Sequence, residues 1–357
     1  MSIWKKIGFF CAFIIPALVV MGYYLGGFWN FGTIVFVFVL IPIFDELVGK
    51  DPENVDEKIV PIISEELYYR LILYGWVFVQ MAFVFWGCYV VSSQAMTSLE
   101  MLGFMLSFPL VTGGIGITVA HELGHKKGKL ERFYSKVLLM TTCYMHFYIE
   151  HNRGHHVNIG TPLDPATSRK GEHFYAFWLR SVRDSYLNAW KLEFERMSKK
   201  GLPRFSSQND MIWFSMIPLL FCLFLTLTFS LLKGQLLWEI PAFFFVQSIL
   251  GFSLLEAVNY IEHYGLLRKE IAPKKYEKVN TLHSWNANQL VSNFFLFQLQ
   301  RHSDHHAYAN RSYQALRHVE ESPQLPAGYP AMILLSLFPP FWFRVMDKKL
   351  AAWKGNS

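Results

Sequence analysis

The chain has 357 residues, of which 52% are hydrophobic and only 17% are charged, and its mean hydropathy is +0.23. This composition excludes an ordinary soluble domain and a disordered chain, and it indicates an integral membrane protein. The net charge of +6 comes without a cluster of basic and aromatic residues of the kind that binds nucleic acid, so no nucleic-acid partner is expected.

Apolar residues are concentrated in six blocks of about 20 residues, the length that an α-helix needs to cross a bilayer. The blocks predict membrane spans at about residues 7–26, 30–48, 70–92, 99–120, 211–232 and 236–259. The first block has no small-residue cleavage site, so we expect it to remain as a helix. The predicted fold is an all-α integral membrane protein that forms a single domain over residues 1–357.

Lysine and arginine alternate strongly between successive connections. The turns at 27–29 and 93–98 have none, whereas residues 121–210 have fifteen and residues 260–357 have twelve. Because positively charged loops stay on the cytoplasmic side, we expect both termini and both long segments to be cytoplasmic. The segments also contain two shorter apolar stretches. These predict a buried or interfacial helix near 139–151 and an interfacial helix over 329–346, rather than further spans.

Eight of the thirteen histidines fall in three tight clusters within the two long segments. The clusters are HELGH with His121 and His125, EHNRGHH with His151, His155 and His156, and QRHSDHHA with His302, His305 and His306. On an ideal α-helix His151 and His155 share a face, while His156 points about 100° away, so the adjacent pair can serve two ions. We expect the three clusters to form one metal centre in a helical cap.

The number of histidines bears on which metal is bound. HELGH, with Glu122 as general base, is also a signature of zinc proteases. A catalytic zinc takes three protein ligands, so eight histidines are too many for one zinc and suit two metals with four or five ligands each. Imidazoles suit iron, copper, nickel or zinc. Soluble di-iron bundles use two E-x-x-H pairs, whereas this chain has one, from Glu122 to His125.

In a chain with six spans, these clusters resemble the integral-membrane di-iron hydroxylase and desaturase superfamily. The chain is more closely similar to the membrane alkane hydroxylases, the bacterial alkane 1-monooxygenases, from about residue 45 to about residue 347. The resemblance is carried by HELGHKK, EHNRGHH, TPLDPATSR, NYIEHYGLLR and LQRHSDHHA, with RSYQALR following. NYIEHYG, at residues 259–265, distinguishes the hydrocarbon hydroxylases from the fatty-acyl desaturases.

The resemblance implies terminal hydroxylation of n-alkanes to primary alcohols with O2, at two non-haem iron ions in a bacterial inner membrane. It also implies a ninth metal ligand, His263. It further implies rubredoxin as electron donor, with rubredoxin reductase upstream. The sequence has no C-x-x-C pair and no flavin, nicotinamide or iron–sulfur motif, so electrons must come from another protein. A face rich in lysine and arginine would attract an acidic donor.

Polar side chains near the clusters are the expected partners of the ligands, since a ligating histidine usually donates its other N–H to a carboxylate or carbonyl. We expect this role for Glu122, Glu150, Asp164, Glu262 and Asp304. Glu256 and Asn259 lie within two turns before His263, and Glu256 either supports a ligand or forms a structural pair. Ordinary structural roles are expected for His146, His173 and His318, while His283 keeps a supporting or donor-contacting role open.

Two other interpretations keep part of this centre. A xylene-type methyl hydroxylase or a lipid desaturase would share the metals and differ in its pocket, so product analysis separates them. An intramembrane zinc protease would need only His121, Glu122 and His125, and would contain one zinc instead of two irons. A transporter or metal sensor is disfavoured, because no charged residues are paired across the spans.

Overall fold

The computed structural model describes residues 3–356. The ends of the predicted 1–357 domain, residues 1–2 and 357, lie outside the described residues, and the single-domain assignment stays a prediction. Within the described part, the segments long and apolar enough to cross a membrane are Ile3–Leu25, Gly27–Val48, Val60–Ser92, Ser98–Gly124, Asp210–Lys233 and Glu239–His263. All six predicted spans are confirmed. The fourth and sixth helices continue past their apolar blocks, and each carries a histidine of the predicted centre at its end.

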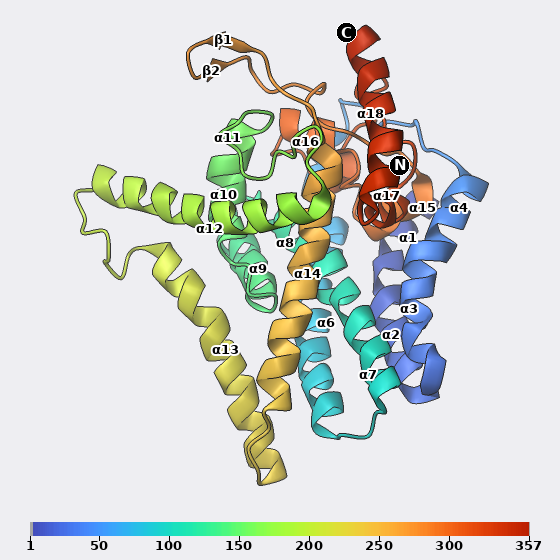
Figure 1. Cartoon of the computed structure of the whole chain (residues 1–357), viewed down its shortest axis with the longest axis vertical. Coiled ribbons are helices and arrows are strands. Elements are labelled where there is room, and N and C mark those ends of the chain that lie inside the picture. Colours follow the sequence, from blue (N-terminus) through green and yellow to red (C-terminus); the bar gives the residue numbers. More distant parts are fainter. Residues whose placement is uncertain (1–2, 357) are drawn as a thin grey trace.

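Several spans are built from more than one helical piece (Figure 1). The pieces are α1 (Ile3–Gly8), η1 (Phe9–Phe13) and α2 (Ile14–Leu25); η2 (Gly27–Phe31), α3 (Gly32–Val35), η3 (Phe36–Leu40) and α4 (Ile41–Val48); α5 (Val60–Glu65) and α6 (Leu67–Ser92); α7 (Ser98–Pro109), η4 (Leu110–Ile115) and α8 (Gly116–Gly124); α13 (Asp210–Lys233); and α14 (Glu239–His263). The break between α5 and α6 is Glu66, whose extended backbone (ψ 120°) interrupts the helix.

The spans differ in how deeply they are buried. The most apolar part of the fourth span is 78% buried, so this helix forms the centre of the bundle, whereas that of the second span is only 17% buried. Exposed leucines such as Leu231 and Leu232 at the end of α13 present an apolar surface suited to lipid. The second span therefore lies at the periphery, while the fourth is enclosed by its neighbours.

The remaining elements form a cap at one end of the bundle, and both ends of the described chain lie at this end (Figure 1). The cap elements are α9 (Lys129–Met140), α10 (Phe147–Glu150), η5 (His151–His155), α11 (His156–Asn158), α12 (Phe174–Lys199), β1 (Glu270–Ala272), β2 (Lys275–Tyr276), α15 (Leu290–Phe295), α16 (His302–Ala307), η6 (Tyr313–Ala315), α17 (Tyr329–Ser336) and α18 (Pro339–Asn356). The strands pair as a small antiparallel hairpin. The apolar stretch at 329–346 is divided between α17 and α18, because the two prolines start a new helix.

One part of this region returns into the bundle. After α8 the chain reverses at Gly128, and α9 runs back along α8 before a non-helical turn at 141–146 leads to α10. The Gln247 amide, in the middle of α14, donates 2.7 Å to the carbonyl oxygen of Thr141, and Gln80 of α6 donates 2.8 Å to its hydroxyl. Backbone groups freed inside an apolar bundle need such partners. The stretch 139–151 is therefore buried, as predicted, but as the tip and return of a re-entrant hairpin.

The fourth and sixth spans cross at the level of this hairpin. A Cβ on Gly113 would lie only 2.3 Å from the backbone of Gly251, so the crossing requires glycine at residue 113. Here the fourth span forms a π-helical turn, η4, just after Pro109. Pro109 has no N–H to donate, which interrupts the α-helical hydrogen-bond pattern at this point. The turn leaves Gly114 facing open space, because an added Cβ there would meet only Leu254, at 3.9 Å.

Candidate metal centre

Nine histidine side chains come together where the fourth and sixth spans meet the cap. They form two groups, and within each group the candidate ligand nitrogens lie within 4.8 Å of one another. The five-histidine group consists of His121, His125, His151, His156 and His305, and the four-histidine group consists of His155, His263, His302 and His306. These are the eight cluster histidines together with the ninth, His263, that the family resemblance implied.

The second cluster divides between the two groups because of its local backbone. The N–H of His156 donates to the carbonyl oxygen of His151, five residues earlier, so η5 is a π-helical turn. This spacing places His151 and His156 together, while His155 joins the other group. The adjacent histidine pair does serve both groups. The partner of His151 differs from the α-helical expectation, which paired it with His155.

The facing nitrogens are spaced as ligands of a single ion would be. In the five-histidine group, His125 Nε2 lies 3.2 Å from His121 Nε2 and 3.1 Å from His151 Nε2. In the four-histidine group, His306 Nε2 lies 2.7 Å from His302 Nε2 and 3.3 Å from His155 Nε2. Ligands at right angles, each about 2.1 Å from a metal, would lie about 3.0 Å apart. The donor set therefore fits two metal ions, and imidazoles suit iron among other transition metals.

Burial keeps most of these imidazoles in the form that binds metals. Loss of water, reinforced by neighbouring imidazoles, holds the pKa well below its ordinary value for His125, His151, His156, His302, His305 and His306. A neutral imidazole offers a nitrogen lone pair, whereas a protonated one offers none. At neutral pH, protons therefore compete only weakly for these ligand positions.

His155 is the exception, because it has a carboxylate partner. Asp164 Oδ2 lies 2.9 Å from His155 Nδ1, the nitrogen opposite the metal side. Burial alone would lower the pKa of His155, but the Asp164 carboxylate outweighs it and raises that pKa. The hydroxyl of Thr167 donates 2.5 Å to the same oxygen. The segment TPLDPATSR thus brings Asp164 to the outer side of a candidate ligand, which is the arrangement expected from sequence.

Two of the other predicted partners contact cations instead of imidazoles. Glu122 Oε1 lies 2.6 Å from Lys126 Nζ and accepts 3.2 Å from the backbone N–H of Tyr313. Asp304 is bound by two arginines, at 2.6 Å from Arg317 and 3.4 Å from Arg311. Both carboxylates therefore pair with cations, and their supporting role beside the metal ligands stays a prediction. Lys126 lies one helical turn after Glu122, and both arginines lie in the loop that follows α16, the helix of Asp304.

The remaining carboxylates are buried without such a cation. Glu150 accepts 3.2 Å from Asn188, and burial, with Asp164 nearby, raises the pKa of Glu150 to about 8. Glu256 accepts 2.7 Å from the Tyr144 hydroxyl and, more weakly, 3.5 Å from Asn259.

Glu262 contacts a candidate ligand directly: its Oε2 lies 3.0 Å from His302 Nε2, and its Oε1 accepts 2.7 Å from the Tyr329 hydroxyl. No spacing pattern in the sequence pointed to Tyr144 or Tyr329.

The other four histidines stay outside both groups. His146 packs against Tyr144 and Tyr186, and His173 accepts from the backbone of Ala176 at the start of α12. His283 faces Glu277 at 3.2 Å. The residue after it, Ser284, lies with its hydroxyl 3.3 Å from the outer nitrogen of His263, a partner that sequence reasoning missed.

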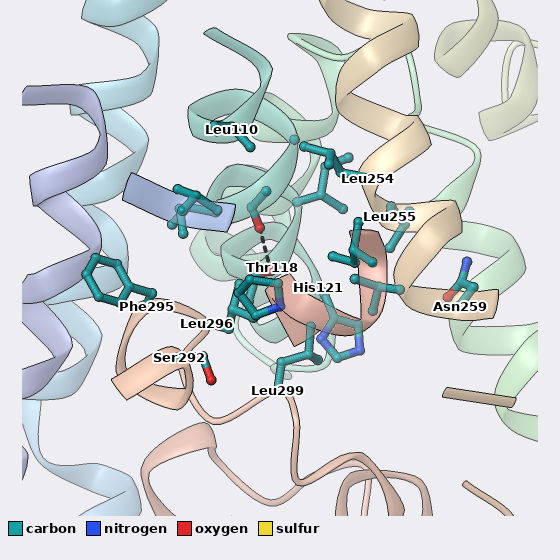
Figure 2. Close-up of a pocket in the computed structure, with 18 of the residues that line it drawn as sticks. Leu110, Thr118, His121, Leu254, Leu255, Asn259, Ser292, Phe295, Leu296 and Leu299 are labelled. Carbon is teal, nitrogen blue, oxygen red and sulfur yellow. Dashed lines mark hydrogen bonds between the residues drawn. The ribbon is translucent and has the colours of Figure 1, made fainter. Parts of the chain in front are cut away.

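An apolar cavity reaches the centre from within the bundle (Figure 2). Its inner wall includes His121 and His151 of one group and His302 of the other. Toward the spans it is lined by hydrophobic side chains of several helices, among them Ile15, Val37, Phe38, Leu110, Leu254 and Leu255. In Figure 2, Leu110 lies near the top of the residues that line the cavity, and His121 lies below it. Asn259 and Glu262 are among the few polar residues on the wall.

Comparison with known proteins gives the same family. The fatty acid desaturase family matches residues 96–336. The chain is 43% identical to Alkane 1-monooxygenase 2 of Pseudomonas aeruginosa, across 98% of this chain and 93% of that protein. Alkane 1-monooxygenase 2 of Alcanivorax borkumensis is 42% identical, across 98% and 92%.

A more distant relative is the xylene/toluene monooxygenase hydroxylase component of Pseudomonas putida, which is 27% identical across 95% of this chain and 88% of that protein. The higher identities extend over nearly the whole chain and agree with the histidine clusters, the six spans and the NYIEHYG segment. The chain therefore belongs to the alkane 1-monooxygenase family, and to the wider fatty acid desaturase family.

Proposed function

We propose that the chain hydroxylates the terminal methyl group of n-alkanes to primary alcohols, using O2 and two non-haem irons held by the nine histidines. The observation that carries the proposal is the apolar cavity, whose wall includes imidazoles of both groups. An n-alkane offers no polar group for recognition, so its position must be set by the shape of an apolar cavity. The names of the relatives at 42–43% identity support the same substrate class.

Bound irons would supply the reduction of O2 and the oxidation of an unactivated C–H bond, which no side chain can perform. The protein's own part is to hold the chain end against the centre and to keep water out. The cavity wall is almost entirely apolar, and His121, His151 and His302 stand at the same end as Phe147. An alkane aligned with the fourth span would therefore present its terminal carbon, because only the end of the chain reaches the imidazoles.

The reaction consumes two electrons and two protons besides O2 and the alkane, and it yields the alcohol and water. The proposed electron donor is rubredoxin, reduced by rubredoxin reductase, since the chain has no flavin or iron–sulfur motif. The two segments that form the cap carry fifteen and twelve basic residues, which would attract an acidic donor.

The proposal is tested with purified protein in lipid, supplied with rubredoxin, rubredoxin reductase, NADH, O2 and n-alkanes of graded length. We expect primary alcohols whose formation depends on every component. Measurement of bound metal should give about two irons per chain. A preparation that is active with one zinc and no iron, or one that yields alkenes, would contradict the proposal.

We further propose that the cap faces the cytoplasm of a bacterial inner membrane, because the basic residues are concentrated in its two segments. Topology reporters fused after Ala95 and after Gly234 should give periplasmic signals. Reporters fused after Pro165 and at the C-terminus should give cytoplasmic signals. A periplasmic signal at Pro165 would reverse the orientation.

The next prediction separates a metal ligand from a neighbouring carboxylate. His121→Ala should remove iron and nearly all activity, because it opens the five-histidine group. Glu122→Gln should lower hydroxylation by no more than about 10- to 100-fold, the range for residues that only support a metal site. The reason is that Glu122 contacts Lys126 and a backbone N–H, and an amide oxygen can still accept from the latter. Complete inactivity of Glu122→Gln with both metals bound would show that this carboxylate takes part in the reaction.

The cavity also predicts how chain length is limited. Gly114 lies seven residues before His121, or about 10 Å along a helix. That length accommodates about eight carbons, since a carbon chain with bonds of about 1.5 Å at about 111° advances about 1.25 Å per atom. Gly114→Leu should reduce activity on dodecane relative to octane at least about fivefold, because overpacking costs about 1–3 kcal/mol.

Gly32→Leu is the matched control. Gly32 lies on the second span and is not on the cavity wall, and a Cβ added to it would meet no atom within 4 Å. Its chain-length profile should equal that of the unmodified protein. Equal dodecane-to-octane ratios for Gly114→Leu and Gly32→Leu would mean that the alkane lies elsewhere.

A further inference from the structure

Glu262 approaches its histidine from a different side than a carboxylate that only orients an imidazole. It lies in the last turn of α14, directly before His263, and only 1% of its surface is exposed. Its Oε1 is held by the Tyr329 hydroxyl at 2.7 Å, which leaves Oε2 directed at His302 Nε2, 3.0 Å away. The carboxylate is thus fixed in place by a buried phenol from another helix, α17.

The nitrogen that Glu262 meets is on the inner side of the four-histidine group. His302 Nε2 is also the atom that lies 2.7 Å from His306 Nε2, and His306 Nε2 in turn lies 3.3 Å from His155 Nε2. Partners on the outer side approach the opposite nitrogen, as Asp164 does at His155 Nδ1 and Ser284 does at His263 Nδ1. Asp164 therefore acts on its histidine from outside, while Glu262 reaches the space on which the imidazoles converge.

The separation between Glu262 and His302 is that of neighbouring ligands. Two ligand atoms about 2.1 Å from a metal and at right angles to each other lie about 3.0 Å apart. Once His302 Nε2 binds a metal it has no proton to donate, so the contact with Glu262 Oε2 would lose its hydrogen bond. Coordination of the same metal by that oxygen resolves the conflict, and mixed histidine and carboxylate ligands are characteristic of non-haem iron oxygenases.

The lack of a compensating cation beside Glu262 also supports its coordination of a metal. Lys126 neutralises Glu122, and two arginines neutralise Asp304, whereas Glu262 has no lysine or arginine partner among the side chains of residues 3–353. A buried carboxylate without a compensating cation is costly. A metal ion in the four-histidine group would provide the missing positive charge.

We propose that Glu262 is a tenth protein ligand, which completes the four-histidine site through Oε2 and gives each metal five protein ligands. The inference rests on the proposed two-metal centre and goes beyond its nine histidines. Glu262 also lines the apolar cavity. It is therefore a carboxylate ligand on the substrate side, and the two metals differ chemically, one bound by imidazoles alone and the other with an anionic oxygen.

Cobalt(II) is the probe for the test, because its visible spectrum depends on the number and type of its ligands. The full-length protein in detergent is stripped of metal and titrated with Co²⁺, with unfolding temperature as the check on folding. Unmodified protein should bind two Co²⁺. Glu262→Gln should bind one with unchanged affinity and the other at least about 100-fold more weakly, with an altered spectrum for the weak ion. Glu262→Asp, which keeps the charge but withdraws the oxygen, should alter the spectrum with a smaller loss of affinity.

Two controls distinguish a ligand from a supporting residue. Glu256→Gln is closely matched, since Glu256 lies on the same helix, is equally buried and accepts 2.7 Å from Tyr144, but its hydrogen bonds are to Tyr144 and Asn259. It should leave both Co²⁺ spectra unchanged. Asp164→Asn acts on the outer nitrogen of His155, so it should weaken binding about 10- to 100-fold and leave the spectrum of the bound ion unchanged.

Three outcomes separate this proposal from the one on which it rests. If Glu262→Gln binds two Co²⁺ with the spectrum of the unmodified protein, Glu262 is not a ligand and the nine-histidine centre stands. If its spectrum stays unchanged while affinity falls as in Asp164→Asn, Glu262 only positions His302, and the proposal is likewise overturned. If the unmodified protein binds a single Co²⁺, the two-metal proposal itself fails.

Discussion

The convergence of nine imidazoles on two points, seven of them buried and two half-buried, is the constraint on which the rest of the structure depends. Their Nε2 atoms face one another at about 3 Å, and two lone pairs at that distance repel unless a metal ion or a proton lies between them. Rigid elements must therefore hold them. The fourth and sixth spans contain His121 and His263, and His125 directly follows the fourth span. The π-helical turn η5 and the short helices α11 and α16 supply the rest. Burial then removes water and protons as competitors for the same nitrogens.

The buried carboxylates divide into two classes around this arrangement. Glu122 and Asp304 are neutralised by lysine and arginine, and Asp304 in particular ties α16 to the segment around Arg311 and Arg317. These pairs hold the cap together. Glu150, Glu256 and Glu262 instead have phenol, amide or imidazole partners. Because an ionised carboxylate is costly to bury without a cation, the positive charge of bound metal ions would favour the ionised form of this second class.

Sequence reasoning reached most of the fold and the identity of the clustered histidines. Six apolar blocks of spanning length leave few alternatives, and histidine spacing on helices is a strong local signal. His263 is isolated in the sequence and was reached only through the family resemblance of NYIEHYG. The sequence did not predict contacts that depend on an irregular helical turn or on how separate segments of the cap pack together. No residue spacing in the sequence signals the π-helical turn that pairs His151 with His156. The arginine partners of Asp304 depend on how the cap folds.

The re-entrant hairpin was missed for a similar reason. The stretch near 139–151 is too short to span a bilayer, and its turn receives hydrogen bonds from Gln80 and Gln247, on helices far away in sequence. In the sequence, the two glutamines are isolated polar residues inside apolar blocks. Their role is visible only once the two spans lie beside Thr141.

The shallow burial of the second span bears on the route by which an alkane would enter the cavity. Val37, Phe38 and Ile41 of this helix line the cavity, yet the most apolar part of the helix is only 17% buried, so one thin helical wall separates cavity from lipid. Under the proposed function, an alkane dissolved among acyl chains reaches the site without passing through water. Saturation would then follow the mole fraction of alkane in the bilayer. Adding empty lipid at constant total alkane would slow turnover by dilution in two dimensions, although the amounts of enzyme and substrate stay the same.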